Sequence, residues 1–267
     1  MEITLVQGLL IALVVFVCAL DYCVEAFMWF RPLVVSFLTG LVLGDVQVGL
    51  AAGAVAELSY LGLLTVGGTV PPDPLIAGLM TTVLAYTTGQ NVEVTLGLSL
   101  PFALLGQWLG IFCNTTFAGF LAPLDQACKD ADTAKFSKIV FGSMALKAGL
   151  YAILAFVSAY AMQSGVSTFV NAFPEALIHG FEIAGGLLPA VGLALLLVVM
   201  LNKKNAAYLL LGFVIVTICD VPNILPVAIA AGSIAFIGYI NDEDVKGWIK
   251  RLAAGAKAVE GGEEDGI

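Results

Sequence analysis

The chain alternates apolar runs with short polar or glycine- and proline-rich breaks. The apolar runs cover residues 3–20, 33–44, 75–88, 94–124, 139–162, 183–201, 206–219 and 224–240. A helix needs about 20 apolar residues to cross a bilayer, so some of these runs can span it and others are too short. The pattern predicts an all-α, polytopic membrane protein in which complete spans are mixed with broken helices.

The stretch from Gly44 to Pro74 is the clearest candidate for broken helices. It is dense in glycine and closes with Pro71, Pro72 and Pro74. Non-helical backbone is tolerated at membrane depth only where protein or a water-filled cavity surrounds it. In transporters, such interrupted segments frame the substrate site. We therefore expect half-helices or a re-entrant hairpin here, with Asp45 able to cap the second half-helix.

Composition agrees with a membrane protein. Hydrophobic residues make up 60% of the 267 positions and charged residues only 12%, whereas soluble domains are about 25% charged. The net charge of −9 comes with no basic surface that could bind nucleic acid. We expect a membrane-embedded domain over residues 1–240 and a polar tail over residues 241–267.

The basic residues of the second half predict a topology. Three groups of basic residues lie near residues 129–138, 203–204 and 246–257, and two apolar segments separate each group from the next. An even number of crossings puts all three groups on one side of the membrane. The excess of Lys and Arg in cytoplasmic loops makes that side the cytoplasm. The C-terminal tail is therefore expected there.

The distribution of acids in the first half points to a function. Residues 32–128 contain no Lys or Arg, yet they include Asp45, Glu57, Asp73 and Glu93. An ionisable residue at membrane depth costs about 2.5–3.5 kcal/mol on insertion scales. We therefore expect these carboxylates to have no cationic neighbour and to be kept for binding a polar ligand.

Glu57 and Asp73 flank the most suggestive segment, which contains Thr65, Gly67 and Gly68. A carboxylate accepts strong hydrogen bonds from hydroxyl groups, and glycines let backbone amides approach a ligand. This combination suits a polyhydroxylated ligand. The alternatives are that Glu57 pairs with another helix or the loop backbone, and that Asp73 forms a turn.

No catalytic centre is expected. The sequence lacks a phosphate-binding loop, a zinc motif and a nucleophile elbow, and its five cysteines form no CxxC pair that would indicate a metal or disulfide site. His179 is the only histidine, and we interpret it as an interfacial residue rather than a phosphate carrier. We predict no catalytic residue, metal or cofactor.

Four segments carry a family resemblance in one order: MEITLVQG, FRPLVVSFLTGLVLGDVQVGL, AELSYLGLLTVGGTVPPDP and HGFEIAGGLLPAVG. Together they resemble the enzyme IIC subunit of the mannose–fructose–sorbose family of the bacterial phosphotransferase system. The segments PPDPLIAGLMTTVLAYTTG and GGLLPAVG are most similar to the N-acetylgalactosamine and galactosamine branch. Thr65 departs from the amide residue expected in mannose-type members, which argues against the mannose branch.

The resemblance implies a sugar permease of the bacterial cytoplasmic membrane. Such a subunit imports its sugar with a IID membrane partner, while IIA relays phosphate to IIB and IIB phosphorylates the sugar. It also implies a trimer of IIC–IID pairs with an elevator-type mobile core on a scaffold. The segment from Glu57 to Asp73 matches the family's sugar-binding region, and Gln7 and Glu25 are expected to face it.

Three alternatives remain from the sequence. The same system could carry mannose, fructose or sorbose. The carboxylates could instead bind protons or sodium in an ion-coupled sugar transporter that works alone. The chain could also be a structural membrane subunit whose partner binds the sugar.

Overall fold

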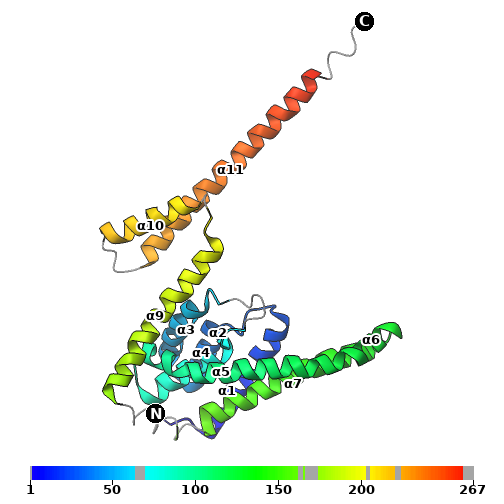
Figure 1. Ribbon diagram of the computed structural model, residues 1–267, viewed down its shortest axis with the longest axis vertical. Coiled ribbons are helices and arrows are strands. Elements are labelled where there is room, and N and C mark those ends of the chain that lie inside the picture. The colour runs from blue at the N-terminus through cyan, green and yellow to red at the C-terminus, as the bar shows by residue number, and fades with distance from the viewer. Residues whose placement is uncertain are drawn as a thin grey trace. The chain divides into compact units, whose positions relative to one another are not determined.

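The protein is helical throughout the part that the structure describes, a computed structural model covering residues 2–63, 70–161, 165, 174–202, 205–219 and 224–260 (Figure 1). This confirms the predicted all-α fold. The helices are α1 (Leu5–Val24), α2 (Pro32–Leu43), α3 (Val46–Tyr60), α4 (Pro74–Thr88), α5 (Val92–Phe117), the short 3₁₀ turn η1 (Ala118–Phe120), α6 (Leu121–Lys129), α7 (Thr133–Phe156) with the π-helical turn η2 (Val157–Ala161), α9 (Glu175–Met200), α10 (Ala206–Cys219) and α11 (Ile224–Glu260).

Four helical stretches within the described residues are long and apolar enough to cross a membrane. They are Leu5–Val24, Val92–Lys129, Thr133–Tyr160 and Ala176–Met200. Helix α2 has only 12 residues, so it is roughly 18 Å long and cannot cross a hydrocarbon core of about 30 Å. Within the stretch from Gly44 to Pro74, the described residues form one short helix, α3, and the flanking apolar runs form the short helices α2 and α4.

Helices α2 and α3 form an antiparallel hairpin with a two-residue turn. Gly44 ends α2 with a φ of 86°, a left-handed conformation that glycine adopts without strain. Asp45 then caps α3, because its carboxylate accepts a 3.0 Å hydrogen bond from the amide of Val48. The two helices touch closely: a Cβ at Gly49 would lie 2.6 Å from the carbonyl oxygen of Ser36. The hairpin therefore brings the start of α2 beside the end of α3.

Helix α4 is the most buried helix in the first half of the chain. Eleven of its 15 residues are buried, and it packs against α2, α3 and α5, while α1 packs against α7 (Figure 1). The Ser36 hydroxyl donates a 2.9 Å hydrogen bond to the carbonyl of Gly78 and ties α2 to α4. The hydrophobic core lies between α1, α2, α4 and α7, and its largest fully buried side chains include Ile11, Leu75, Leu79, Met80 and Tyr151.

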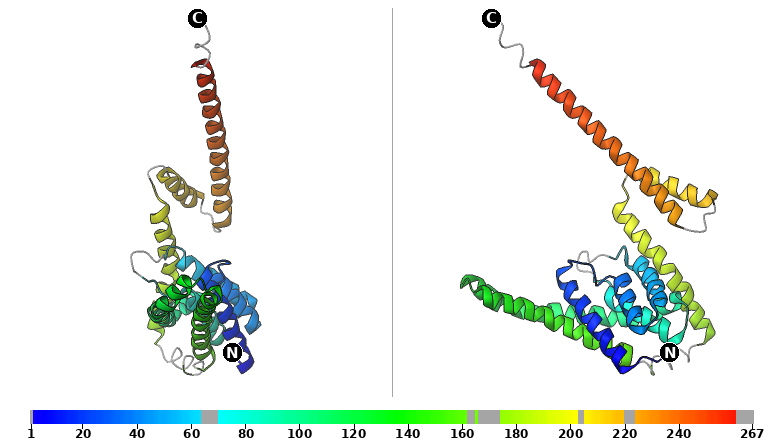
Figure 2. Two further views of the ribbon diagram at one scale, coloured as in Figure 1. Left: turned by 90° about the vertical axis from the view of Figure 1, so that its right-hand side faces the viewer. Right: turned by 180° about the vertical axis from the view of Figure 1, so that it is seen from behind.

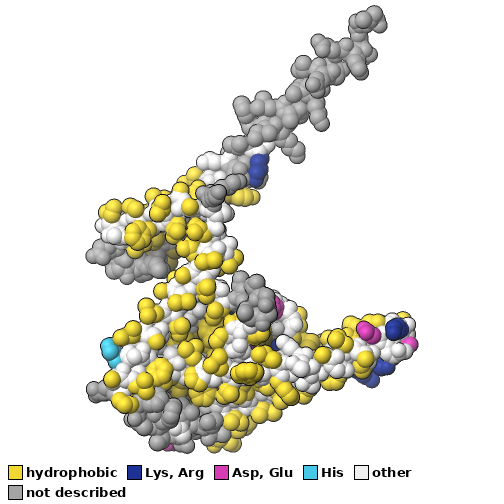
Figure 3. All heavy atoms as spheres, viewed as in Figure 1, with side chains coloured by type: hydrophobic (Ala, Val, Ile, Leu, Met, Phe, Trp, Pro, Cys, Tyr) yellow, Lys and Arg dark blue, Asp and Glu magenta, His cyan; other side chains and the backbone are white. Residues whose placement is uncertain are grey.

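Two features of the middle of the chain are not evident from its composition. Pro101 does not interrupt the apolar run, because α5 continues through it from Val92 to Phe117. A helix in a membrane protein tolerates proline where neighbouring groups satisfy the freed backbone. The polar segment after α5 is also helical: α6 and α7 form a hairpin (Figure 2), and its outer end carries charged side chains (Figure 3).

The chain divides into two compact units, residues 1–200 and residues 201–267. The second unit contains α10 and α11, which pack against each other. Helix α11 runs from Ile224 to Glu260. The boundary that we expected at residue 240 lies within this helix.

Candidate functional site

Three of the seven candidate residues lie near one end of the short helices in the first unit. Glu25 follows α1, Glu57 lies in the last turn of α3, and Asp73 caps the start of α4. A Cβ at Gly78, in the second turn of α4, would lie 2.8 Å from Pro32 at the start of α2. The α2–α3 hairpin and α4 thus bring these three carboxylates to the same region.

Glu57 forms an ion pair with Arg31, which corrects the expectation of a carboxylate without a cationic neighbour. The Arg31 Nε donates a 2.7 Å hydrogen bond to Oε1 of Glu57, and Nη2 donates to the same oxygen. The amide of Leu33 donates to Oε2 at 3.2 Å. Arg31 immediately precedes the cation-free stretch, and the hairpin folds it back beside Glu57.

The Arg31–Glu57 ion pair retains hydrogen-bonding groups that a ligand can use. The side chains of Arg31 and Glu57 are 28% and 19% exposed. A guanidinium has five N–H donors and a carboxylate about four acceptor positions. The hydrogen bonds described within the protein use only some of these donors and acceptor positions. The pair can therefore bind a hydroxyl or carbonyl group of a ligand without breaking.

Asp73 is in a different environment, because it is only 3% exposed and both of its carboxylate oxygens have protein partners. Oδ1 accepts a 3.0 Å hydrogen bond from the amide of Ile76 and so caps α4. Oδ2 accepts a 2.7 Å hydrogen bond from the Tyr151 hydroxyl on α7. The Asp73 amide donates to the carbonyl of Ala103 on α5 at 3.0 Å. Asp73 thus joins α4 to α5 and α7.

A lysine inside a membrane span completes the surroundings of Asp73. Lys147 belongs to the apolar stretch Thr133–Tyr160, and its Nζ lies 4.6 Å from the ring centroid of Tyr22 and 5.9 Å from that of Tyr151. Such cation–π contacts stabilise a poorly hydrated ammonium group. Tyr22 also stacks on Phe30 at 4.5 Å. Neither Lys147 nor Tyr151 was predicted from the sequence, although a lysine within an apolar span is itself a signal of function.

Tyr60 is the one residue in the described part with a buried side-chain oxygen or nitrogen that lacks a hydrogen-bond partner. Its side chain packs against Ala77 and Ala103. Both residues bond to the backbone of Asp73: the Ala77 amide donates to its carbonyl, and the Ala103 carbonyl accepts from its amide. The hydroxyl of Tyr60 therefore lies next to the Asp73 cap. No sequence pattern distinguishes this tyrosine from an ordinary core tyrosine.

Glu25 lies in a tightly held loop between α1 and α2. Its side chain is exposed, and its backbone ends α1 with a φ of 53°. Asp21, which is 8% exposed, accepts hydrogen bonds from the amides of Phe27 at 2.9 Å and Trp29 at 2.7 Å. A buried carboxylate therefore fixes the path of the chain from Glu25 to Arg31.

Gln7 lies at the opposite end of α2 from these carboxylates. Its side-chain amide donates a 3.4 Å hydrogen bond to the carbonyl of Leu43 and closes a capping box with Thr4. The length of α2, roughly 18 Å, separates this end from Arg31 and Glu57. Thr65, Gly67 and Gly68 lie outside the described residues.

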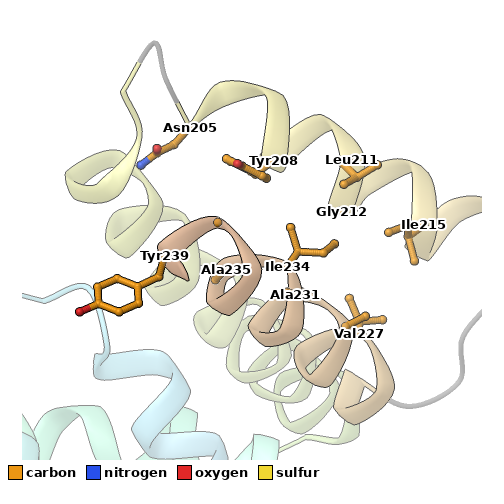
Figure 4. A pocket seen from close by; sticks show the side chains of 12 residues that line it. Asn205, Tyr208, Leu211, Gly212, Ile215, Val227, Ala231, Ile234, Ala235 and Tyr239 are labelled. Carbon is orange, nitrogen blue, oxygen red and sulfur yellow. The ribbon is translucent and has the colours of Figure 1, made fainter. Parts of the chain in front are cut away.

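Two other features do not form the site. His179 is exposed and lies 3.3 Å from Glu182, and no group of three or more potential metal ligands occurs among the described residues. A groove of about 730 Å³ lies between α10 and α11 (Figure 4). Its lining is mainly apolar, from residues such as Leu211, Ile215 and Val227, and it offers no carboxylate to a hydroxylated ligand.

The first unit therefore presents spanning helices, short half-helices and a partly exposed ion pair, which together are typical of a membrane transport subunit. Comparison with known proteins specifies the class. The family described as "PTS system sorbose-specific iic component" matches residues 5–237. The chain is 45% identical to "N-acetylgalactosamine permease IIC component 1" of Escherichia coli (strain K12) over 240 residues, 90% of each chain.

Three further matches have lower sequence identity. The chain is 33% identical to the "PTS system mannose-specific EIIC component" of the same E. coli strain, over 80% of this chain and 81% of that protein. A solved "Structure of membrane protein" matches with a TM-score of 0.80 at 30% identity, over 90% of this chain and 97% of that one. The "CryoEM Structure of Mannose Transporter ManYZ and Microcin E492 (MceA) complex" matches with a TM-score of 0.57 and the same identity and coverage.

The chain belongs to the IIC-component family of the mannose- and sorbose-type phosphotransferase systems. It is a sugar permease component, the membrane translocation subunit and not the phosphorylating one. It is a multi-pass protein of the inner membrane and associates with other components of its system. The predicted family is confirmed, and the ion-coupled transporter loses its support.

Proposed function

We propose that the sugar carried is an amino sugar, N-acetylgalactosamine or galactosamine. The observation that carries this proposal is the 45% identity to an N-acetylgalactosamine permease component over 90% of the chain. The identity falls to 33% for a mannose-specific component and to 31% for sorbose and fructose components.

In this proposal the Arg31–Glu57 pair is the polar centre of the sugar site. Glu57 accepts hydrogen bonds from sugar hydroxyls, and Arg31 donates to ring or acetamido oxygens. Glu25 lies in the loop that leads to Arg31 and adds a second carboxylate. Thr65, Gly67 and Gly68, which lie outside the described residues, are proposed to contribute to sugar binding as well.

Asp73 and Gln7 have supporting roles in the proposed site. Asp73 holds the start of α4 in place, because both of its oxygens are already bonded within the protein. Gln7 fixes the start of α1 and contacts the turn end of α2. A hexose at Glu57 does not reach Gln7 in this arrangement of the helices.

The partners follow from the family. A IID membrane subunit completes the permease, the pairs assemble as a trimer, and IIB, phosphorylated by IIA, donates phosphate to the sugar. Elevator-type movement of a core on a scaffold carries the sugar. The two apolar segments of the sequence between successive basic groups support a cytoplasmic C-terminus.

The test is transport in membrane vesicles that contain the chain with its IID, IIB and IIA partners. Phosphoenolpyruvate should drive the appearance of phosphorylated N-acetylgalactosamine inside the vesicles. Unlabelled galactosamine should compete, and mannose, sorbose and fructose should compete at least 10-fold less well. Stronger competition by mannose would reject the proposed sugar but not the transport mechanism. Accumulation of unmodified sugar would reject the mechanism itself.

A further inference from the structure

The loop between α1 and α2 presents aromatic side chains in a fixed arrangement. Phe27 is 70% exposed and Trp29 is 41% exposed, and their ring centroids lie 5.3 Å apart at an angle of 30°. The amides of both residues donate to the buried carboxylate of Asp21. Phe30, the next residue, turns inward and stacks on Tyr22. The loop is therefore anchored on both sides of Trp29.

The backbone of this loop is strained. Glu25 and Met28 have φ values of 53° and 59°, a region that residues other than glycine seldom adopt. Such strain persists only where the surrounding structure holds it, and it is concentrated at ligand-binding sites. A membrane anchor needs no fixed geometry, because lipids adapt to any aromatic side chain. A rigid arrangement favours a partner of defined shape.

The position of the loop beside the Arg31–Glu57 ion pair favours a sugar as the binding partner. Trp29 is two residues from Arg31, so their Cα atoms are at most about 7.6 Å apart. The amide of Arg31 donates to the carbonyl of Met28 at 3.1 Å, which closes the loop onto the ion pair. An apolar aromatic surface beside a few polar groups is the usual composition of a small-molecule site. A sugar matches it, since one face of a hexose exposes C–H groups and its rim exposes hydroxyls.

We propose that Trp29 is the aromatic platform on which the sugar ring packs, and that Asp21 is the positioning residue that fixes this platform beside Arg31 and Glu57. This inference rests on the proposed function, because it adds the apolar half of the same site. Phe27 supports Trp29 from the side, and the C–H face of the hexose covers the exposed indole.

The first test is the sugar dependence of phosphoenolpyruvate-driven uptake in vesicles that contain the complete system. Trp29→Leu should raise KM for N-acetylgalactosamine about 3- to 10-fold, as expected for the loss of one aromatic contact. Because this contact binds the ground state, kcat should change little. Trp29→Phe should recover most of the affinity. Trp108→Leu is the matched control, since Trp108 is an exposed tryptophan on α5.

Asp21→Asn tests the positioning role. An asparagine offers one acceptor oxygen and places N–H groups near the amides that Asp21 now binds. We expect KM to rise as it does in Trp29→Leu, with no further rise when the two substitutions are combined. Additive effects would show that Asp21 acts independently of Trp29 and would overturn its role. If Trp29→Leu reduces the amount of protein in the membrane, Trp29→Phe is used instead. A KM slightly above that of the unsubstituted chain would then support the aromatic platform, and an unchanged KM would reject it.

The competing role for Trp29 is a lipid anchor. A full-length chain with Trp108→Phe and Trp248→Phe retains Trp29 as its only tryptophan. In vesicles of brominated phospholipids, its fluorescence should be quenched little. Strong quenching together with an unchanged KM in Trp29→Leu would overturn the inference.

The outcomes separate this inference from the proposed function. If Glu57→Gln raises KM and Trp29→Leu does not, only the aromatic platform is rejected. If neither substitution changes KM, the proposed sugar site is rejected as well. If the unsubstituted chain forms no phosphorylated sugar, the proposed function itself is rejected.

Discussion

Glu57 and Asp73 are both acids within a long segment that has no basic residue, yet the fold treats them in opposite ways. Glu57 is partly exposed and shares its charge with Arg31. Asp73 is buried, and its oxygens are bonded to the Ile76 amide and the Tyr151 hydroxyl. Each acid has a cation in its surroundings, but Arg31 contacts Glu57 directly, whereas Lys147 lies over the rings of Tyr151 and Tyr22.

The comparison shows that an acid in an apolar segment need not contact the ligand. A carboxylate whose oxygens are already bonded within the protein gains little from binding a ligand. Replacing such a carboxylate lowers the stability of the protein considerably, because its buried hydrogen-bond donors lose their partner. A partly exposed ion pair can accept a ligand and costs less to disturb. Hydrogen-bond saturation and exposure, rather than the presence of charge, distinguish the two roles.

The largest expected effect is on folding at Asp73. Asp73→Ala removes the cap of α4 and leaves the Tyr151 hydroxyl only its longer, 3.3 Å hydrogen bond to the Gly106 carbonyl, for a loss of about 2–4 kcal/mol. We expect little assembled protein in the membrane, measured by detergent extraction and size-exclusion chromatography. Asp73→Asn is the matched control, since asparagine also caps helices. It should assemble and transport sugar; an assembled but inactive Asp73→Asn protein would make Asp73 a sugar ligand.

The next effect is on transport at Glu57. Glu57→Gln removes a charge-assisted interaction worth about 1.5–3 kcal/mol, so KM for uptake should rise roughly 10- to 100-fold. The amount of protein in the membrane should stay near that of the unsubstituted chain, because glutamine can still accept from Arg31. Wild-type uptake by this variant would remove Glu57 from the sugar site.

Tyr151→Phe should have a smaller effect on stability. It deprives the buried Oδ2 of Asp73 of its donor, which costs about 1–3 kcal/mol, while the aromatic ring under Lys147 remains. Thermal unfolding in detergent should occur at a lower temperature, and KM for sugar should be unchanged. A change in KM without a change in unfolding temperature would contradict the structural role of this contact.

The smallest expected effect is a gain in stability, at Tyr60. Tyr60→Phe removes a buried hydroxyl that has no partner within the described residues, so the substitution should raise stability by up to about 1 kcal/mol. A modest rise in unfolding temperature with unchanged uptake is the expected result. Lower stability would mean that the hydroxyl has a partner, and weaker sugar binding would assign it to the site.

Much of the helical framework could be predicted, because apolar runs and their breaks are local features. The expected runs at residues 3–20, 33–44 and 75–88 correspond closely to α1, α2 and α4. Helix α5 continues through Pro101, and α11 continues past residue 240, where we expected a polar tail. Whether a proline is accommodated depends on neighbouring helices, which local composition does not reveal.

The contacts of the candidate site were harder to predict. The expectation that Glu57 lacks a cation was wrong because Arg31 is 26 residues away in sequence and is brought back only by the α2–α3 hairpin. Tyr151 and Lys147 reach Asp73 and Tyr22 from α7, whose place beside α1 depends on packing between distant segments. The grouping of Glu25, Glu57 and Asp73 at one end, and the distance of Gln7 from it, also follow from this topology.

The turn at Gly44 and Asp45 has a consequence for the electrical barrier to transport. Its amides bond to the carbonyls of Gly40 and Leu41, and the Asp45 side chain accepts from Val48, so the turn needs no water to stabilise it. When the other end of the hairpin is at one face of the bilayer, a turn roughly 18 Å deep stops about 12 Å short of the opposite face. Any aqueous vestibule that reaches this turn confines the transmembrane voltage to that remaining layer. Neutral N-acetylgalactosamine then crosses the layer without electrical work, whereas a phosphorylated sugar would not.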